Sequence, residues 1–208
     1  MTKVKICGIT NLEDALVAAK FGADALGLNF YEKSPRYISP GKAGEISSEL
    51  PKEILKVGVF VNELVENIIS IAKSAKLDAV QLHGDETSTF IGELRELSDL
   101  QIIKALRVKH DFRPEAVLDH DADAILLDTY SPKEHGGTGV SFDWKIASAV
   151  SKLVDRLYLA GGINQDNVAA AIDEVRPYAV DVCSGVESES RKKDPKKLET
   201  FIRNAKGA

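Results

Sequence analysis

The amino-acid sequence predicts an α/β fold, a single (β/α)8 TIM barrel that spans residues 1–208 as one domain. Three observations lead to this prediction. Short runs rich in Val, Ile and Leu recur at a repeat of about 25 residues, which is the length of a βα unit rather than of a hairpin. Each run ends on a polar or small residue and is followed by a helical pattern. No linker or low-complexity stretch divides the chain.

Apolar runs that alternate with helices are typical of parallel strands covered on both faces. In chain order, the expected strands are 4–7, 23–29, 55–62, 79–83, 102–107, 124–128, 157–161 and 179–183. An open doubly wound sheet is the alternative. It would have fewer strands and a G-x-G-x-x-G sequence after the first strand, where Cys7-Gly8-Ile9-Thr10 stands instead.

The segments between the strands carry helical patterns. Residues 11–20 and 63–74 place apolar side chains at helical spacing. Asn164 could cap the helix after the seventh strand, and the last helix is expected to begin near Asp194-Pro195. The fifth unit has the weakest pattern, so only a short helix is expected within residues 110–119.

The composition excludes several classes of protein. Hydrophobic residues make up 44% and charged residues 28%, as in an ordinary globular chain. The net charge is −5 with no long basic block, so neither nucleic acid nor an anionic membrane surface is an expected partner. No apolar run approaches the roughly 18 residues that span a bilayer, and no signal peptide is evident. Two cysteines do not make a disulfide scaffold, so a cytoplasmic location is expected.

The residues that close the strands are the first candidates for function, because the loops at this end of such a barrel form its active-site face. Polar side chains gathered there are costly unless they have a role. The closing residues are Cys7, Asn29, Asn62, His83, Arg107, Asp128, Gly161 and Cys183.

Cys7 and Asp128 are the candidate proton-transfer groups. Cys7 precedes an expected helix N-terminus that would lower its pKa, so the thiolate could be a nucleophile or a general base. A small buried hydrophobic residue is the alternative interpretation of Cys7. Asp128 directly follows three aliphatic residues, and the next helix begins only near residues 142–143, too far on for Asp128 to cap it. A carboxyl in this position is suited to donate a proton.

Two glycine-bearing loops follow the last two strands, Gly161-Gly162 and Ser184-Gly185. Barrels often bind phosphate there through backbone N–H groups, although ordinary tight turns would look the same. Arg36 could pair with a substrate carboxylate or be a solvated surface residue. The segment Gly136–Gly139 is either a lid or a flexible connection.

The other polar candidates give weaker signals. Lys5 and Asp181 are expected to pair beneath the site if the first and eighth strands are neighbours. Gln81 and His83 share a face of the fourth strand and are either site residues or polar barrel lining. The cluster 191–193 is expected to be a solvated turn.

Neither a metal-ligand cluster nor a Walker or dinucleotide sequence is present, so no metal and no cofactor are expected. These residues predict an isomerase for a small phosphorylated ligand.

The motifs also carry a family resemblance. They are Lys5–Thr10 (KICGIT), Ser34–Arg36 (SPR), Gln81–Gly84 (QLHG), Leu126–Thr129 (LLDT), Gly136–Gly139 (GGTG) with Phe142–Trp144 (FDW), Ala160–Gly162 (AGG) and Asp181–Glu187 (DVCSGVE). Together they resemble phosphoribosylanthranilate isomerase, in order and over essentially the whole chain. The resemblance implies an Amadori rearrangement in tryptophan biosynthesis, in which the aminoaldose phosphoribosylanthranilate becomes 1-(2-carboxyphenylamino)-1-deoxyribulose 5-phosphate.

The resemblance also implies roles for single residues. Asp128 would be the general acid and Cys7 the general base, while Arg36 would hold the anthranilate carboxylate. The substrate-binding residues it implies are Arg36, His83, Asp181, Gly161, Gly162, Ser184 and Gly185. The small-molecule substrate is then the expected partner of a chain that is either a monomer or a homodimer.

One position departs from the family pattern, because Cys183 stands where a serine is usual. It places two thiols at the ends of neighbouring strands. The alternatives are a non-catalytic barrel that binds a phosphorylated ligand, a sibling sugar-phosphate isomerase, and an enzyme with a thiol nucleophile. A sibling isomerase of histidine biosynthesis would have a carboxylate in place of Cys7.

Overall fold

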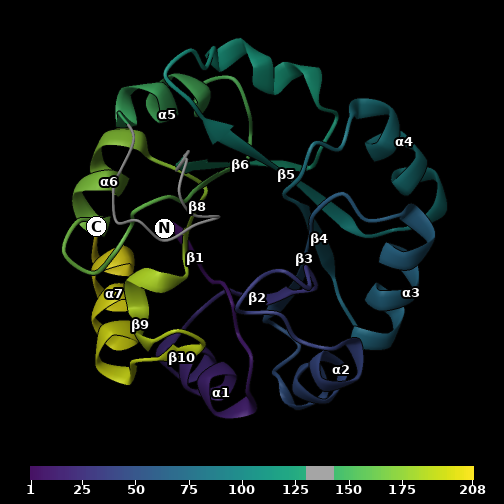
Figure 1. Cartoon of the computed structure of the whole chain (residues 1–208). Helices are drawn as coiled ribbons and strands as arrows, with labels where there is room; N and C mark the ends of the chain where they lie inside the picture. Colours follow the sequence, from purple (N-terminus) through teal and green to yellow (C-terminus); the bar gives the residue numbers. More distant parts are fainter. Residues whose placement is uncertain (130–142) are drawn as a thin grey trace.

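The structure is a computed structural model that describes residues 1–129 and 143–208. At its centre, eight parallel strands form a closed barrel in sequence order, as Figure 1 shows. The barrel closes where Lys5 of the first strand pairs with Asp181 of the last. The strands are β1 (Lys3–Ile6), β2 (Ala25–Asn29), β3 (Leu55–Phe60), β4 (Ala79–Leu82), β5 (Gln101–Val108), β6 (Ala124–Thr129), β7 (Leu157–Leu159) and β8 (Ala179–Val182). The expected (β/α)8 fold is confirmed.

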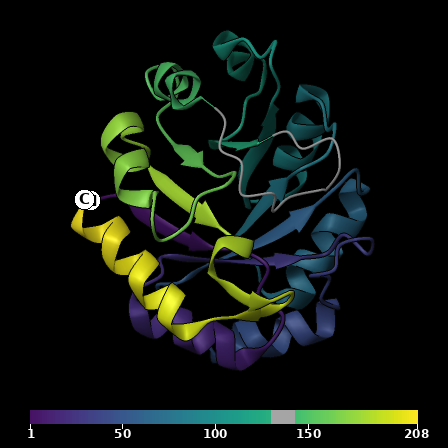
Figure 2. The same cartoon turned by 60° about the vertical axis from the view of Figure 1, so that its left-hand side comes forward.

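The helices surround the strands on the outside of the barrel (Figures 1 and 2). They are α1 (Leu12–Phe21), α2 (Pro40–Glu49), α3 (Val65–Ala75), α4 (Ser88–Leu97), the 3₁₀ helix η1 (Pro114–Asp119), α5 (Trp144–Val150), α6 (Val168–Val175) and α7 (Pro195–Gly207). The fifth unit therefore has the short helix that its sequence predicts. Among the described helices, none is long and apolar enough to cross a membrane.

An addition that the sequence did not reveal follows β8. The 3₁₀ helix η2 (Ser184–Val186) leads into a small antiparallel pair, β9 (Glu187–Glu189) and β10 (Lys192–Lys193). The prediction of a solvated turn at 191–193 is wrong for Lys193, whose side chain is buried. Its ammonium lies 3.1 Å from Glu187 Oε1, so burial is compensated by an ion pair.

Capping residues explain where the helices begin. The Asn11 side chain accepts a hydrogen bond from the Asp14 N–H, and Asp194 does the same for Lys196 at the start of α7. The predicted cap at Asn164 is wrong, because α6 begins later, after Asn167. The Asn164 side chain instead accepts from the Asp166 N–H, which stabilises a turn before the helix.

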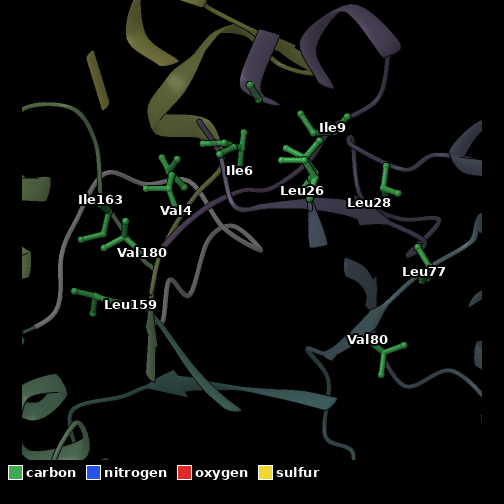
Figure 3. Close-up of a cluster of buried hydrophobic side chains, with 14 of the residues drawn as sticks. Val4, Ile6, Ile9, Leu26, Leu28, Leu77, Val80, Leu159, Ile163 and Val180 are labelled. Atoms are coloured by element: carbon green, nitrogen blue, oxygen red, sulfur yellow. The ribbon is translucent and has the colours of Figure 1, made fainter. Parts of the chain in front are cut away.

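Apolar side chains form two layers. The outer layer lies between strands and helices, and Figure 3 shows part of it. Apart from Tyr158, the inner layer fills the barrel with small or branched residues, because a barrel of this size leaves little room inside. The labelled outer residues are Val4, Ile6, Ile9, Leu26, Leu28, Leu77, Val80, Leu159, Ile163 and Val180. The inner ones are Ala25, Val57, Ala79, Ile103, Ala105, Ala124, Leu126, Tyr158, Ala160 and Ala179.

A buried ion pair fixes the loop between β4 and α4. Lys104 donates to Glu86 Oε2 over 2.7 Å and to the Gly84 carbonyl over 2.8 Å. Glu86 also accepts from the N–H groups of Asn62 and Gly84. Both charged side chains are 2% exposed, so each depends on the other for stabilisation.

Replacing Lys104 by methionine should destabilise the fold by about 3 kcal/mol, because it leaves the Glu86 carboxylate buried without its cation. Urea unfolding of Lys104→Met measures this loss. Arg95→Met is the matched control, since Arg95 is 40% exposed and its pair with Asp123 should contribute less than about 1 kcal/mol. Equal losses in the two variants would contradict the assigned role of the buried pair.

Candidate active site

Side-chain alternation brings most of the predicted site residues to one end of the barrel interior. Successive residues of a strand point to opposite faces, so a residue two places beyond an inward one also points inward. Lys5 and Asp181 face each other inside the barrel, and Cys7 and Cys183 come two places later. In the same way, Asp128 lies two residues after Leu126, which points into the barrel, so Asp128 also points inward. The rim at the carboxyl ends of the strands therefore holds the proposed thiol and carboxyl groups.

Cys7 and Cys183 contact each other across the seam of β1 and β8. The Cys7 N–H donates to the Val182 carbonyl over 2.8 Å, which aligns the two strand ends. The hydrogen bond to Cys183, together with burial, raises the pKa of Cys7 well above its ordinary value. The hydrogen bond from Cys7, together with the charges of Lys193 and Arg36, lowers the pKa of Cys183 to about 7.

The expectation that a helix N-terminus lowers the pKa of Cys7 is therefore wrong. The helix α1 begins only at Leu12, after the cap Asn11, so Cys7 is not in its first turn. The nearby Lys5 ammonium does favour the Cys7 thiolate, but the hydrogen bond to Cys183 and burial outweigh it. The cations instead gather at Cys183, where Lys193 Nζ lies 3.8 Å from Sγ.

One thiolate should form in the folded protein as the pH rises through about 7, because Cys183 ionises first and Cys7 keeps its proton. Thiolate absorbance at 240 nm, followed against pH, measures this transition. Cys183→Ser should abolish the transition near pH 7 and leave only ionisation at higher pH. A transition that survives unchanged in Cys183→Ser would contradict the assignment.

The predicted pair of Lys5 and Asp181 is confirmed beneath the two thiols. Lys5 Nζ lies 2.8 Å from Asp181 Oδ1, and both residues are buried. Burial opposes the charge on Lys5, but Asp181 more than compensates and holds the pKa of Lys5 above its ordinary value. Burial raises the pKa of the neighbouring Tyr158 to about 12, so its hydroxyl keeps its proton.

Arg36 lies beside the thiols and is held by a carboxylate that the sequence did not single out. Its Nε and Nη2 donate to the two oxygens of Glu187 over 2.8 and 2.6 Å. This bidentate hydrogen bond raises the pKa of Arg36 above its ordinary value. Burial alone would raise the pKa of Glu187, but the nearby Arg36 and Lys193 hold it below its ordinary value. The guanidinium has five N–H donors, and the bond to Glu187 uses one edge of it.

His83 and Asp128 face each other on the opposite side of the rim. His83 Nε2 lies 3.4 Å from Asp128 Oδ2, and both side chains are 21% exposed. The other ring nitrogen of His83 lies 2.8 Å from Gln81 Nε2. The strand β4 therefore supplies both polar residues that its alternation predicted, and it directs one of them at the candidate acid.

The two predicted phosphate loops lie together at the ends of β7 and β8. Gly161 and Gly162 have φ angles of 78° and 70°, which a residue with a side chain rarely adopts. A Cβ at Gly185 would collide with the Ile163 carbonyl, so the second loop packs directly on the first. Ser184 and Gly185 are the first two residues of the short helix η2. Glycines at these places let backbone N–H groups approach an anion closely.

Two expectations concern other parts of the site. The glycine segment 136–139 lies outside the described residues, so the prediction of a lid there is not tested. Among the residues that the structure describes, no group of three or more His, Cys, Asp or Glu side chains is placed to hold a metal ion.

Comparison with known proteins decides the family. The family model described as N-(5'phosphoribosyl)anthranilate (PRA) isomerase matches residues 4–204. The chain belongs to this family. It is 49% identical to the N-(5'-phosphoribosyl)anthranilate isomerase of Trichlorobacter lovleyi over 208 residues, with both chains covered completely.

Solved structures of phosphoribosylanthranilate isomerases superpose on the whole chain. One describes monomers of the dimeric enzyme from Thermotoga maritima, with a TM-score of 0.89 and 46% identity over 100% of both chains. Another is a complex with reduced 1-(o-carboxyphenylamino)-1-deoxyribulose 5-phosphate, with a TM-score of 0.88 and 46% identity over 100% of both chains. The chain is accordingly an aldose–ketose isomerase of tryptophan biosynthesis, as its motifs predicted.

Proposed function

We propose that Asp128 and Cys7 are the acid and the base with which this chain isomerises N-(5'-phosphoribosyl)anthranilate. Asp128 donates a proton to the furanose ring oxygen, which breaks the bond from that oxygen to C1 and leaves a protonated imine. Cys7 then removes the proton on C2, and the electron pair of that bond forms an enolamine. Tautomerisation of the enolamine gives the aminoketose product.

The observation that carries this proposal is the position of the two groups. Cys7 directly follows β1 and Asp128 is the last residue but one of β6, on opposite sides of one rim, and strand alternation turns both inward. A sugar seated in the mouth of the barrel would lie between them. The Lys5 ammonium near Cys7 also supports a role as base, because its charge favours the thiolate form of Cys7.

The groups that flank this pair suit the two ends of the substrate. The loops at Gly161-Gly162 and Ser184-Gly185 would bind the phosphate through backbone N–H groups, and Asp181 would accept from the ribose hydroxyls. Arg36 would hold the anthranilate carboxylate with the edge of its guanidinium that Glu187 does not use. His83, whose Nε2 lies 3.4 Å from Asp128 Oδ2, is the remaining residue of the proposed substrate-binding set.

Replacing Arg36 by lysine should raise KM about tenfold to hundredfold, because a point charge cannot make a bidentate pair with the carboxylate. The turnover number should change much less, since the carboxylate is remote from the reacting carbons. Initial rates over a range of substrate concentrations separate the two constants. A variant with unchanged KM would contradict the role given to Arg36.

The remaining features of the proposal concern the state of the protein. We expect one barrel domain over residues 1–208. The two free cysteines support a cytoplasmic location, and the net negative charge supports the absence of a nucleic-acid partner. The Thermotoga maritima relative is described as dimeric, which favours a homodimer over a monomer here. Sedimentation equilibrium of the purified chain distinguishes these two states.

A further inference from the structure

Three residues form a line from the barrel interior to the candidate acid. Gln81 lies on β4 and is 1% exposed, and its Nε2 lies 2.8 Å from His83 Nδ1. His83 Nε2 lies 3.4 Å from Asp128 Oδ2. An amide nitrogen only donates, so the ring nitrogen that faces it must accept and the proton of neutral His83 must lie on Nε2. Nε2 is the ring nitrogen nearest the Asp128 carboxyl.

The backbone on either side of His83 is already fixed. The His83 N–H donates to the Phe60 carbonyl over 2.8 Å, and its own carbonyl accepts from Arg107 Nη2 over 3.3 Å. Just beyond, the Gly84 carbonyl is held by Lys104. These contacts fix the main chain at His83, and Gln81 adds a contact to the ring nitrogen Nδ1.

Stability does not account for an amide at this position. Gln81 Oε1 is buried and has no hydrogen-bond partner among the residues that the structure describes. A buried acceptor without a partner destabilises a fold by about 1–3 kcal/mol. An apolar residue of similar volume would remove that cost, so the presence of Gln81 points to a role outside folding.

We propose that Gln81 is a positioning residue that fixes His83 as the Nε2-protonated tautomer, and that His83 thereby directs the acid proton of Asp128. Because Nε2 is the His83 atom nearest Oδ2, this tautomer places the acid proton of Asp128 on the other oxygen, Oδ1. After proton transfer, the same donor stabilises the new carboxylate. This role rests on the proposed function of Asp128 as the general acid.

The tautomer can be read directly in the free enzyme. In ¹⁵N-histidine spectra of the wild type, we expect the His83 ring, assigned by its disappearance in His83→Gln, to carry its proton on Nε2. Gln81→Leu should lose this single tautomer and show a mixture or the Nδ1-protonated form. A wild-type ring protonated on Nδ1, or an unchanged Nε2-protonated ring in Gln81→Leu, would overturn the proposal.

The activity of matched variants tests the link to Asp128. The amide nitrogen of His83→Gln can replace Nε2 as a donor, whereas that of His83→Asn lies where Nδ1 was and faces Gln81. We expect kcat to fall about tenfold to hundredfold in His83→Asn and in Gln81→Leu, and to fall less in His83→Gln than in His83→Asn. Equal losses in the two His83 variants, or full activity in Gln81→Leu, would overturn the proposal.

A stability measurement separates positioning from folding. Gln81→Leu should unfold in urea at the same or a higher concentration than the wild type, so its loss of activity cannot come from a damaged barrel. A large loss of stability would instead show that Gln81 is structural and overturn the proposal. The tautomer is measured without substrate, so that result does not depend on the proposed function of Asp128. The activity of Asp128→Asn tests the proposed function separately.

Discussion

Asp128→Asn should lower kcat by at least about 10³-fold, the largest effect expected for any single change in this chain. An amide is isosteric with the carboxyl but cannot donate a proton to the furanose oxygen, so the ring must open without a general acid. Asp128 is only partly buried, and its neighbour His83 remains in place, so we expect the variant to fold. Steady-state turnover of the purified variant measures the loss.

Asp85→Asn is the matched control for this change. Asp85 is an exposed aspartate in the loop after β4, on the same end of the barrel, and its side chain makes no contact that the proposed mechanism uses. Its replacement should leave kcat within about twofold of the wild type, as is usual for exposed surface changes. Comparable turnover by Asp128→Asn and Asp85→Asn would show that Asp128 is not the acid.

Cys7→Ser should lower kcat by about 10³-fold as well, because a hydroxyl is a far weaker acid than a thiol and forms its anion much less readily. The change keeps the shape of a small buried residue, so KM should change little. Cys7→Ala should lose activity to the same extent, which distinguishes loss of the base from a defect in packing. A serine variant that retains more than a tenth of the wild-type turnover would contradict the role of Cys7.

The periodic pattern of the chain was sufficient to predict the fold and the rim of the barrel at which the candidate site residues lie. Apolar strands that are followed by helices at a repeat of about 25 residues leave few alternatives to a barrel. Because side chains alternate along each strand, the closing residues Cys7, His83, Asp128 and Cys183 could be placed at one rim without coordinates. The pair of Lys5 and Asp181 followed from the closure of β1 on β8.

The features that the sequence did not reveal depend on contacts between distant segments. Lys193 looked like part of a solvated basic cluster, yet it is buried because β9 and β10 fold back on α1, where its N–H meets Asp14. Glu187 binds Arg36 across 151 residues of sequence. The pKa order of the two thiols depends on where these cations lie, which no local pattern encodes.

The sequence analysis missed the charged pair of Glu86 and Lys104 for a related reason. A lysine in the middle of an apolar strand conflicts with burial unless its partner is known. The partner lies in the loop of the neighbouring strand β4, and the same loop positions His83. A signal did exist in the sequence, since one charge within an otherwise apolar strand indicates a buried partner.

The most direct test of the central claim is a single-turnover reaction with freshly generated N-(5'-phosphoribosyl)anthranilate, followed by the loss of its fluorescence with enzyme in excess. Binding of the reduced product analogue to each protein is measured alongside. Rapid loss of fluorescence with the wild type is the predicted result, with analogue binding but a rate lower by about 10³-fold for Cys7→Ser and Asp128→Asn. A wild type that binds the analogue without turnover, or a variant that reacts at the wild-type rate, would contradict the claim that these two side chains move the protons.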